Sequence, residues 1–339
     1  MGTDARFDRR PIGVEQIEDW LELLAAVEAE DRVDEHHGAE DLHAMLADPY
    51  CDFPRGSLAV YDGERMIGYG YLKARTAADQ VHEFYYLGAV HPAYRGRGVG
   101  AELLAWAEQA ALPLHRERYP DRPLSLYSSS LARDTAAAAL YEAHGYTAAR
   151  WFHGMTRDLT KPLPDLPMPD GVEARRFTAE RSEDARLVRN EAFRDHWGST
   201  ESTVESWAHM TEGPAFRPEL GFIAYEGGSA TGEGADGAGE ALGIVLAEEY
   251  AAHSEATGER DLYISLVGTR RQGRKRGIAS ALLVQALAAA REAGFATASL
   301  GVDAGSPTGA LGLYEQVGFT VKDTWVAQLK PLWQPGDPA

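Results

Sequence analysis

Hydrophobic residues recur along this chain with two different periods, which divide it into helices and strands. A period near 3.6 predicts two helices in each half of the chain, at residues 14–30, 39–46, 182–194 and 203–210. Apolar runs typical of strand hairpins follow each pair of helices, at residues 57–61 with 66–74 and at 221–225 with 241–247. Ser182 and Thr203 are suitable N-cap residues for the second pair of helices. The same series of elements is therefore predicted twice.

The two hairpins differ at their tips. The first has the tight turn Asp62-Gly63-Glu64, whereas residues 226–240 of the second form a long, acidic stretch rich in glycine. Such a composition buries little apolar surface and is typical of a flexible tip. A substrate lid is the alternative interpretation.

Two further segments occur in the same order in each half. The first runs from the end of an apolar strand through a turn with arginine and glycine into an amphipathic helix, at residues 89–100 and 268–279. The second places Leu-Tyr-Glu shortly before a glycine and an aromatic residue, at residues 140–146 and 313–319. Two matches in the same order and at similar spacing indicate an internal duplication.

Prolines alternate with other residues at 161–171, between the two halves. Because proline fixes φ and removes a backbone donor, this stretch predicts a stiff, extended linker. A chain of 339 residues is also long enough for two domains of ordinary size. We therefore expect an N-terminal domain over 1–160 and a C-terminal domain over 172–339, both of the α/β class.

Composition narrows the kinds of partner. Apolar residues make up 44% of the chain and charged residues 25%, as in soluble globular proteins, and no run approaches the roughly 18 apolar residues of a membrane span. The first residues lack the apolar core of a secretory signal, so we expect a cytoplasmic protein with no membrane partner. A net charge of −19 argues against nucleic acid and suits a cationic substrate, although acidity also serves solubility.

Cys51 is the only cysteine, which excludes an intrachain disulfide and a site with several thiolates. No basic residue stands beside it to lower its pKa, so we interpret it as an incidental loop or packing residue. The adjacent His36 and His37 suggest a metal, but neighbouring helical positions face different sides and no third ligand is evident. No metal is expected.

The repeated turns suit a bound phosphate. A helix start leaves backbone N–H groups without partners and carries positive partial charge. Gly98 and Gly100 allow a ligand to approach, and Arg95 and Arg97 supply charge, while the second turn keeps Arg274, Gly277 and the small Ala279. The spacing is not the Gly-x-Gly-x-x-Gly of dinucleotide domains, and no Gly-Lys-Ser/Thr follows.

The pattern Arg-x-x-Gly-x-Gly/Ala, followed by Leu-Tyr-Glu-x-x-Gly-Tyr/Phe, resembles the motifs of the GNAT superfamily of N-acetyltransferases. The match covers both halves, and the tandem arrangement resembles that of the mycothiol synthase family. The resemblance implies, in each domain, a mixed and mainly antiparallel sheet with a splayed central pair of strands flanked by helices. It also implies acetyl-CoA as cosubstrate, with its pyrophosphate on the amides of the turn and its pantetheine arm along the splayed strand.

Carried over by position, the resemblance assigns residues of both turns to acetyl-CoA: Val90, Arg95, Gly96, Arg97, Gly98, Val99 and Gly100 in the first, and Thr269, Arg274, Lys275, Arg276, Gly277, Ile278 and Ala279 in the second. Tyr141 and Tyr314 take the position of the general acid that protonates the departing thiolate, although a tyrosine there is also typical of a packed core. Many members have a cofactor-contacting asparagine before this tyrosine, where Asp134 and Ser306 stand here. This departure bears on cofactor affinity.

The sequence identifies the general base less clearly than the general acid. An amine must be neutral to attack a thioester, so a carboxylate or a water must take its proton. Glu83 and Asp261 stand at the matching starts of the strands before the turns, and Glu248 and Glu249 end a neighbouring strand. All four are equally typical of solvated strand ends. Residues 193–198, Phe-Arg-Asp-His-Trp-Gly, lie where GNAT domains build the acceptor pocket, or simply end a helix.

Together these features predict an acetyl-CoA-dependent N-acetyltransferase that acts on the amine of a small, cationic molecule. We expect the C-terminal domain, with Tyr314, to be the catalytic one, because that is the arrangement in the family it resembles. Two alternatives stay open: a module that senses acetyl-CoA without turnover, and an enzyme that acetylates a protein amine. The duplication suits either a monomeric pseudo-dimer or a homodimer.

Overall fold

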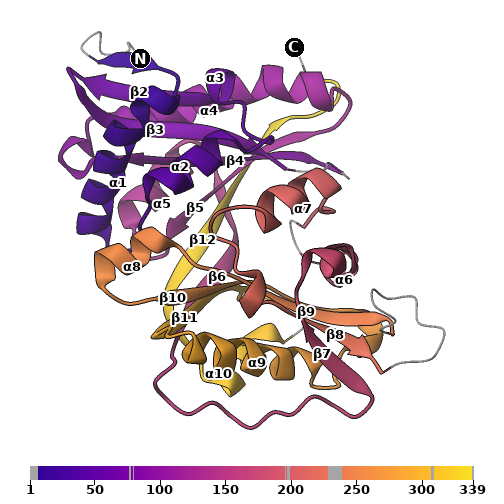
Figure 1. Ribbon diagram of the computed structural model, residues 1–339. Coiled ribbons are helices and arrows are strands. Elements are labelled where there is room, and N and C mark those ends of the chain that lie inside the picture. The colour runs from indigo at the N-terminus through magenta and orange to yellow at the C-terminus, as the bar shows by residue number, and fades with distance from the viewer. Residues whose placement is uncertain are drawn as a thin grey trace. The chain divides into compact units, whose positions relative to one another are not determined.

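The computed structural model describes residues 7–75, 78, 80–194, 196, 199–227, 239–306 and 309–337. The chain forms two compact units: unit 1 comprises Met1–Trp151 and Asp323–Ala339, and unit 2 comprises Phe152–Lys322 (Figure 1). Within the described ranges, no helix has the length and apolar character that a bilayer crossing requires.

The helices and strands follow one another as β1 (Asp8–Arg10), α1 (Ile17–Asp31), α2 (Ala39–Leu46), α3 (Phe53–Gly56), β2 (Ser57–Asp62), β3 (Arg65–Ala74), β4 (His82–Val90), α4 (Val99–Arg118), β5 (Leu124–Leu131), α5 (Thr135–Ala143), β6 (Thr147–Asp158), β7 (Val172–Arg176), α6 (Ser182–Ala192), α7 (Val204–Thr211), β8 (Phe222–Glu226), β9 (Ala241–Glu248), α8 (Ala251–Thr257), β10 (Asp261–Thr269), α9 (Ile278–Glu292), β11 (Thr297–Asp303), α10 (Ala310–Val317) and β12 (Thr320–Trp333).

The sheet of unit 1 has the strand order β1-β2-β3-β4-β5-β12. Neighbouring strands are antiparallel except for β4 and β5, which are parallel. This pair is in register only from His82–Leu124 to Tyr85–Tyr127, although both strands continue beyond that point. The central pair is therefore splayed.

Unit 2 repeats this design with the order β7-β8-β9-β10-β11-β6. The parallel pair is β10 and β11, in register only from Asp261–Thr297 to Tyr263–Ser299, and the other neighbours are antiparallel. The predicted fold, a mixed and mainly antiparallel sheet with a splayed central pair, is confirmed in both units.

The sixth strand of each sheet comes from the other half of the sequence. In unit 1 it is β12, whose residues from Trp325 to Trp333 pair with β5. In unit 2 it is β6, whose residues from Phe152 to Asp158 pair with β11. The compact units therefore differ from the expected domains 1–160 and 172–339, and the proline-rich stretch 161–171 lies inside unit 2.

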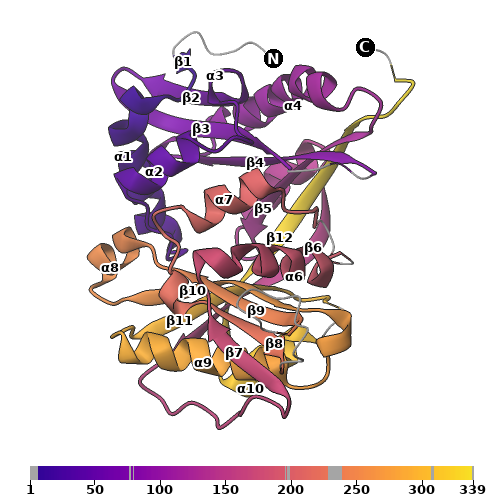
Figure 2. The same cartoon turned by 45° about the vertical axis from the view of Figure 1, so that its right-hand side comes forward.

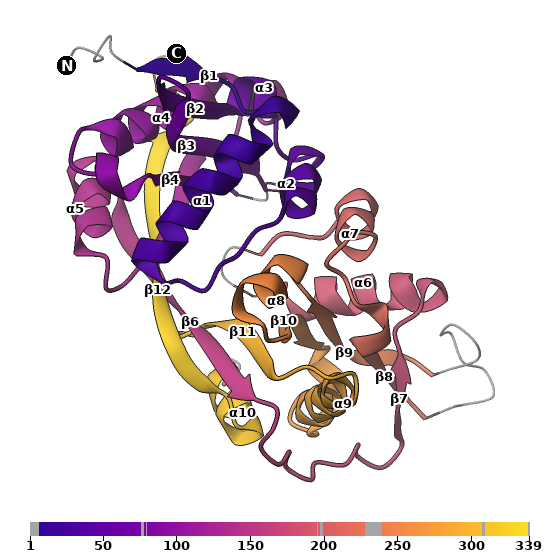
Figure 3. The ribbon, with the colours of Figure 1, turned by 60° about the vertical axis from the view of Figure 1, so that its left-hand side comes forward.

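Each sheet is covered on both faces by helices, as apolar residues on two faces require. In unit 1, Trp20 and Leu23 of α1 and Leu42 of α2 pack on one face, and Leu103 and Leu104 of α4 pack on the other (Figure 3). In unit 2, α6 and α7 cover one face, and α9 and α10 cover the opposite face (Figure 2). Burial of these faces is the main favourable term in the stability of each unit.

The helices and hairpins predicted from periodicity are confirmed, with ends shifted by a few residues. Thr203 is the N-cap of α7, where its Oγ1 accepts a hydrogen bond from the Ser206 amide at 3.1 Å. The prediction of Ser182 as an N-cap is wrong: it lies inside the first turn of α6, and its hydroxyl accepts a hydrogen bond from Trp207 Nε1 at 2.9 Å. Residues 228–238 of the glycine-rich hairpin tip lie outside the described residues.

Two histidines are wholly buried in unit 1. His82 at the start of β4 and His115 in α4 face each other with their Nδ1 atoms 2.9 Å apart. One ring must donate and the other accept, so a second proton at this contact would set two N–H donors against each other. Burial and the neighbouring His115 lower the pKa of His82 to about 4.

This pair predicts an acid-sensitive contribution to stability. Because the pKa of His82 is about 4 in the folded chain, below the 6.5 of an unperturbed histidine, the fold favours the neutral ring. The contribution is full above pH 6.5 and is lost as the pH falls toward 4, by roughly 2 kcal/mol at pH 4.5. Chemical unfolding at pH 7 and pH 4.5 measures it, with His82→Phe as control. An equal acid loss in that variant would contradict the assignment.

Candidate active site

The first repeated turn connects β4 to α4 in unit 1. Gly96 and Gly98 have φ values of 73° and 89°, in the left-handed region that side chains disfavour. A Cβ built at either position would meet no atom within 4 Å, so the backbone faces open space. Because the first N–H groups of a helix lack intrahelical partners, this turn has both the room and the donors for an anionic ligand.

The second turn connects β10 to α9 in unit 2 with the same backbone course. Gly277, the residue before α9, has a φ of 85°, and a Cβ there would again meet no atom within 4 Å. Lys275 stands in the place of Gly96 and keeps a left-handed φ of 62°. The left-handed backbone conformation of Gly96 is therefore retained at Lys275, although the glycine is replaced.

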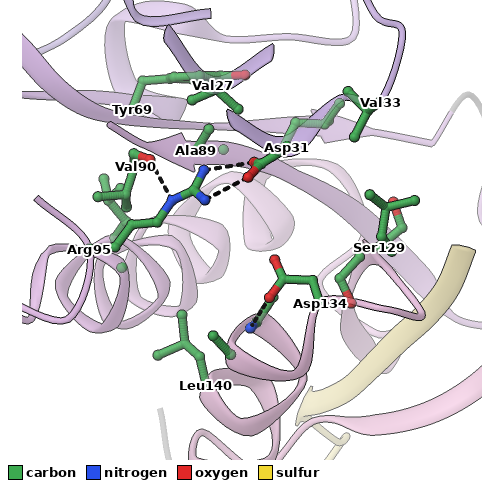
Figure 4. Close-up of a pocket in the computed structure, with 18 of the residues that line it drawn as sticks. Val27, Asp31, Val33, Tyr69, Ala89, Val90, Arg95, Ser129, Asp134 and Leu140 are labelled. Atoms are coloured by element: carbon green, nitrogen blue, oxygen red, sulfur yellow. Dashed lines mark hydrogen bonds and ion pairs between the residues drawn. The ribbon is translucent and has the colours of Figure 1, made fainter. Parts of the chain in front are cut away.

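The two motif arginines fix the turns rather than extend into them. Arg95 Nε donates to the Val90 carbonyl at 3.1 Å, and Arg274 Nε donates to the Thr269 carbonyl at 3.3 Å. In unit 1 the Arg95 guanidinium also forms two hydrogen bonds to the Asp31 carboxylate, at 2.6 and 2.7 Å (Figure 4). These bonds raise the pKa of Arg95. Arg274 instead contacts the carbonyl of Ala192, at 3.1 Å.

The turn of unit 1 opens on a cavity of about 1250 Å³. Five of the predicted cofactor residues line it, namely Val90, Arg95, Gly96, Gly98 and Gly100, together with Tyr141. Two do not: Val99 is buried in the core, and the Arg97 guanidinium lies 4.9 Å from the centre of the Tyr94 ring. Figure 4 shows Arg95, Asp31 and Asp134 facing this cavity.

The turn of unit 2 opens on a smaller cavity of about 740 Å³. It is lined by six of the seven predicted cofactor residues, namely Thr269, Arg274, Lys275, Gly277, Ile278 and Ala279, and by Tyr314. Arg276 points elsewhere, because its guanidinium pairs with the Glu226 carboxylate at 3.0 and 3.1 Å. Turn and tyrosine are thus brought together in both units.

The two motif tyrosines differ in the state of their hydroxyl groups. Tyr141 and the Ser128 hydroxyl are 2.6 Å apart in unit 1. The Tyr314 hydroxyl makes no hydrogen bond to any residue that the structure describes. Burial raises the pKa of both phenols, that of Tyr314 to about 12, so both keep their proton at neutral pH.

The predicted bases are held away from the cavities. The Glu83 carboxylate accepts a hydrogen bond from Arg75 at 2.6 Å. The Asp261 carboxylate accepts hydrogen bonds from the hydroxyl groups of Thr297, at 2.6 Å, and Ser299. Neither lines either cavity. Both stay predictions as bases.

The carboxylates of Glu248, the last residue of β9, and of Glu249, which follows it, are also bound by other side chains. Glu249 is bound by two arginines, Arg217 at 2.9 Å and Arg260 at 2.6 and 3.0 Å, which together lower its pKa. Glu248 accepts a hydrogen bond from the Tyr250 hydroxyl at 2.7 Å. These contacts favour a structural role for both.

The predicted acceptor cluster lies partly at the cavity of unit 2. Phe193 and His196 line it, with ring centres 5.2 Å apart, whereas Asp195, Trp197 and Gly198 lie outside the described residues. Asp303, at the end of β11, also lines this cavity and was missed. The sequence could have indicated Asp303 by its position at the end of the strand that precedes the helix of Tyr314.

Ser265 was missed as well. It lies at an irregularity of β10, where the register against β9 shifts between Ile264 and Leu266, and it lines the same cavity. Such bulges redirect a strand locally and are common beside active sites. No irregularity of this kind separates β3 from β4 in unit 1, where the register is continuous.

Asp134 and Ser306 stand at the positions where many members of the resembled family have an asparagine, and both take part in local hydrogen bonds with the backbone. Asp134 caps α5, where its carboxylate accepts a hydrogen bond from the Ala137 amide at 2.9 Å. The Ser306 amide donates to the Asp303 carbonyl at 3.1 Å, and α10 begins only at Ala310. Asp134 also lines the cavity of unit 1, so the same residue caps α5 and forms part of the cavity wall.

The single cysteine behaves as an unreactive thiol. Cys51 forms an isolated backbone bridge with Lys73. Burial, and then the charge of Asp48, raise the pKa of its thiol to about 12. A thiol with this pKa stays protonated at neutral pH, which argues against a nucleophilic cysteine.

Comparison with known families finds a match in each half. The acetyltransferase (GNAT) domain profile matches residues 54–148, and the acetyltransferase (GNAT) family profile matches residues 186–319. Among curated relatives, the mycothiol acetyltransferase of Thermobispora bispora is 31% identical over 275 residues, which are 78% of this chain and 79% of the relative.

Solved structures show the same architecture over the full length. A GCN5-related N-acetyltransferase from Sphaerobacter thermophilus has a TM-score of 0.76 at 28% identity, covering 100% of this chain and 99% of its own. A tandem GNAT protein from the clavulanic acid biosynthesis pathway has a TM-score of 0.70 at 17% identity, covering 98% of this chain and 100% of its own. The second likeness concerns the fold alone.

Proposed function

Because this chain belongs to the GNAT family of acetyltransferases, with one GNAT domain matched in each half, we propose that it moves the acetyl group of acetyl-CoA directly to the amine of a small molecule. One observation supports this most strongly. In each unit an open helix start lies at a cavity that the tyrosine of the second repeated segment also lines.

The residues present fit acetyl-CoA. Its pyrophosphate would lie against the amides that follow Gly98 or Gly277, where the backbone is unobstructed and the helix dipole favours an anion. Its pantetheine arm would lie in the gap between the splayed strands. There β4 beyond Tyr85 and β10 beyond Tyr263 no longer pair with their parallel neighbour, which leaves backbone groups to hydrogen-bond the arm's amides.

The reaction requires two proton movements. The neutral amine attacks the thioester carbonyl carbon, the carbon–sulfur bond breaks, and the acetyl group stays on nitrogen. The amine gives up a proton to a base, and the departing thiolate takes one from Tyr314. A positioned acid of this kind contributes roughly 10²- to 10⁴-fold to the rate. The raised pKa of Tyr314 ensures that the proton is present at neutral pH.

We assign the chemistry to unit 2. Tyr314 lines the cavity of unit 2, and its hydroxyl has no hydrogen-bonding partner among the described residues, whereas the hydroxyl of Tyr141 is bound to Ser128. The motif arginine of unit 2 also has no carboxylate partner among those residues, while Arg95 is paired with Asp31. In both cases the residue of unit 2 lacks, among the described residues, the side-chain partner that its counterpart in unit 1 has.

The acceptor is proposed to be a small amine that is cationic in solution. The relative from Thermobispora bispora is named a mycothiol acetyltransferase, so the first candidate is the amine of a thiol cofactor precursor. Amino sugars and polyamine-like molecules share the same chemistry. An excess of acidic residues, with a net charge of −19, favours such acceptors.

A screen of acceptors tests the proposal. Purified protein is mixed with acetyl-CoA and each of several small amines, and release of the coenzyme thiol is followed together with the mass of the product. We expect thiol release that depends on the amine and an equal amount of N-acetylated product. Thiol release with a peptide amine alone would favour a protein substrate, and none with any amine would favour a sensor.

Salt dependence provides a separate prediction. If surface charge steers a cationic amine to the acidic protein, kcat/KM for that amine should fall several-fold between about 0.02 and 0.5 M NaCl, because salt screens such steering. A neutral amine of similar size serves as the control. An anionic best substrate whose rate does not change with salt would contradict the proposal.

A further inference from the structure

Ser128, on β5 of unit 1, is the hydrogen-bonding partner of the Tyr141 hydroxyl. The Ser128 hydroxyl donates to the Tyr86 carbonyl at 2.9 Å, and it lies 2.6 Å from the Tyr141 hydroxyl. A serine hydroxyl has one proton, which this geometry places on the bond to the carbonyl. The proton between the two hydroxyl groups therefore belongs to Tyr141. Both side chains are buried, so water does not offer an easy replacement for this bond.

Unit 2 has a glycine at the same place. Leu124 of β5 and Thr297 of β11 are the first residues of their strands to pair with the parallel neighbour. Ser128 and Gly301 each stand four residues further along, just beyond the point where the parallel strands separate. Gly301 lines the cavity together with Tyr314 and has no side chain to hold the tyrosine hydroxyl.

We propose that this strand position determines whether a unit can act as a proton donor: Ser128 holds the proton of Tyr141 in unit 1, and Gly301 leaves that of Tyr314 available in unit 2. The proposal rests on the proposed acetyl transfer, in which the thiolate needs this proton. Gly301 is thus a positioning residue, because it acts through Tyr314. Unit 1 has the same turn and a cavity, but the proton of Tyr141 is held in the hydrogen bond to Ser128.

Glycine at 301 is not required by the backbone. Its φ is not left-handed, and a Cβ built there would meet only the Tyr263 hydroxyl, at 3.7 Å. A distance in that range is an ordinary van der Waals contact. A serine can therefore be introduced at position 301 without strain.

The test compares Gly301→Ser with Gly301→Ala. The two variants add the same Cβ and differ by one hydroxyl group. We expect kcat of the serine variant to be at least about tenfold below that of the alanine variant, with KM for acetyl-CoA equal within about twofold. In a Tyr314→Phe background the serine and alanine variants should have the same kcat. Equal kcat values of the two variants in the Tyr314 background would overturn the proposal.

A second measurement does not depend on turnover. If Ser128 binds the Tyr141 hydroxyl, Ser128→Ala should lower Tm by about 2 °C more in the wild-type background than in a Tyr141→Phe background. Equal shifts in the two backgrounds would overturn the role of Ser128. A protein that shows this coupling but acetylates no amine would instead refute the proposed function, so the two failures can be told apart.

Discussion

Tyr314→Phe is expected to lower kcat by at least about tenfold at saturating acetyl-CoA, while Tyr141→Phe changes it by less than about twofold. The phenylalanine keeps the ring in its buried position and removes only the proton that the thiolate would take. Because the Tyr314 hydroxyl has no hydrogen-bonding partner among the described residues, its loss should not disturb the surrounding fold. Steady-state kinetics at fixed pH measures both variants.

The Tyr141→Phe variant is a matched control from the same chain. It removes the equivalent hydroxyl in unit 1, which is bound to Ser128, and it should therefore affect stability more than rate. A kcat loss confined to Tyr141→Phe would move the active site to unit 1. Two unaffected variants would remove the tyrosine from the mechanism, and water would be left as the proton donor.

Gly277→Glu should weaken acetyl-CoA binding at unit 2 by at least about tenfold. The new carboxylate would stand at the start of α9, where the coenzyme pyrophosphate is expected, so two anions would compete for the same amides. Gly98→Glu should have the same effect at unit 1, because Gly98 has nearly the same φ. Calorimetric titration with acetyl-CoA should show two sites in the unmodified protein and one in each variant.

A backbone control separates charge from strain. Gly277→Asn adds a side chain at the same left-handed φ of 85° but carries no charge, and asparagine tolerates this conformation better than most residues. It should bind acetyl-CoA more tightly than Gly277→Glu. Two sites that persist in both glutamate variants would contradict the assignment of the turns, and no binding by the unmodified protein would contradict the coenzyme.

The repeat made the fold predictable from the sequence. Each half contains a period-3.6 segment, a hairpin, an arginine- and glycine-bearing turn and a Leu-Tyr-Glu segment, and the structure arranges both sets in the same way. Local periodicity and turn composition are properties of neighbouring residues, so they can be read directly. The position of Tyr141 and Tyr314 at the cavities followed from the same repeat and the family resemblance.

The exchange of β6 and β12 was not predictable in this way. Alternation along a strand shows that it has a buried face, but it does not show which strand it pairs with. The linker at 161–171 marks a change in composition, yet unit 2 already begins at Phe152, inside β6 and before the linker. A boundary drawn from composition therefore differs from one drawn from strand pairing.

The hydrogen-bonding partners of the site were also beyond the sequence. Arg95 and Arg274 look equivalent in the motif, and only the structure shows that Asp31, at the end of the longer helix α1, pairs with the first. Likewise, Ser128 and Gly301 lie in strands without a shared motif, so their equivalence depends on register. Contacts between residues distant in the chain need the folded geometry.

A single-turnover experiment tests most directly the claim that unit 2 carries the acetyl transfer. The Gly98→Glu and Gly277→Glu variants are each mixed with saturating acetyl-CoA and then with the acceptor amine found in the screen, and acetylated amine is quantified at short times. We predict that product forms at least about tenfold faster with Gly98→Glu than with Gly277→Glu, because only the former keeps an intact turn beside Tyr314. Faster product formation with Gly277→Glu would contradict the assignment of the chemistry to unit 2.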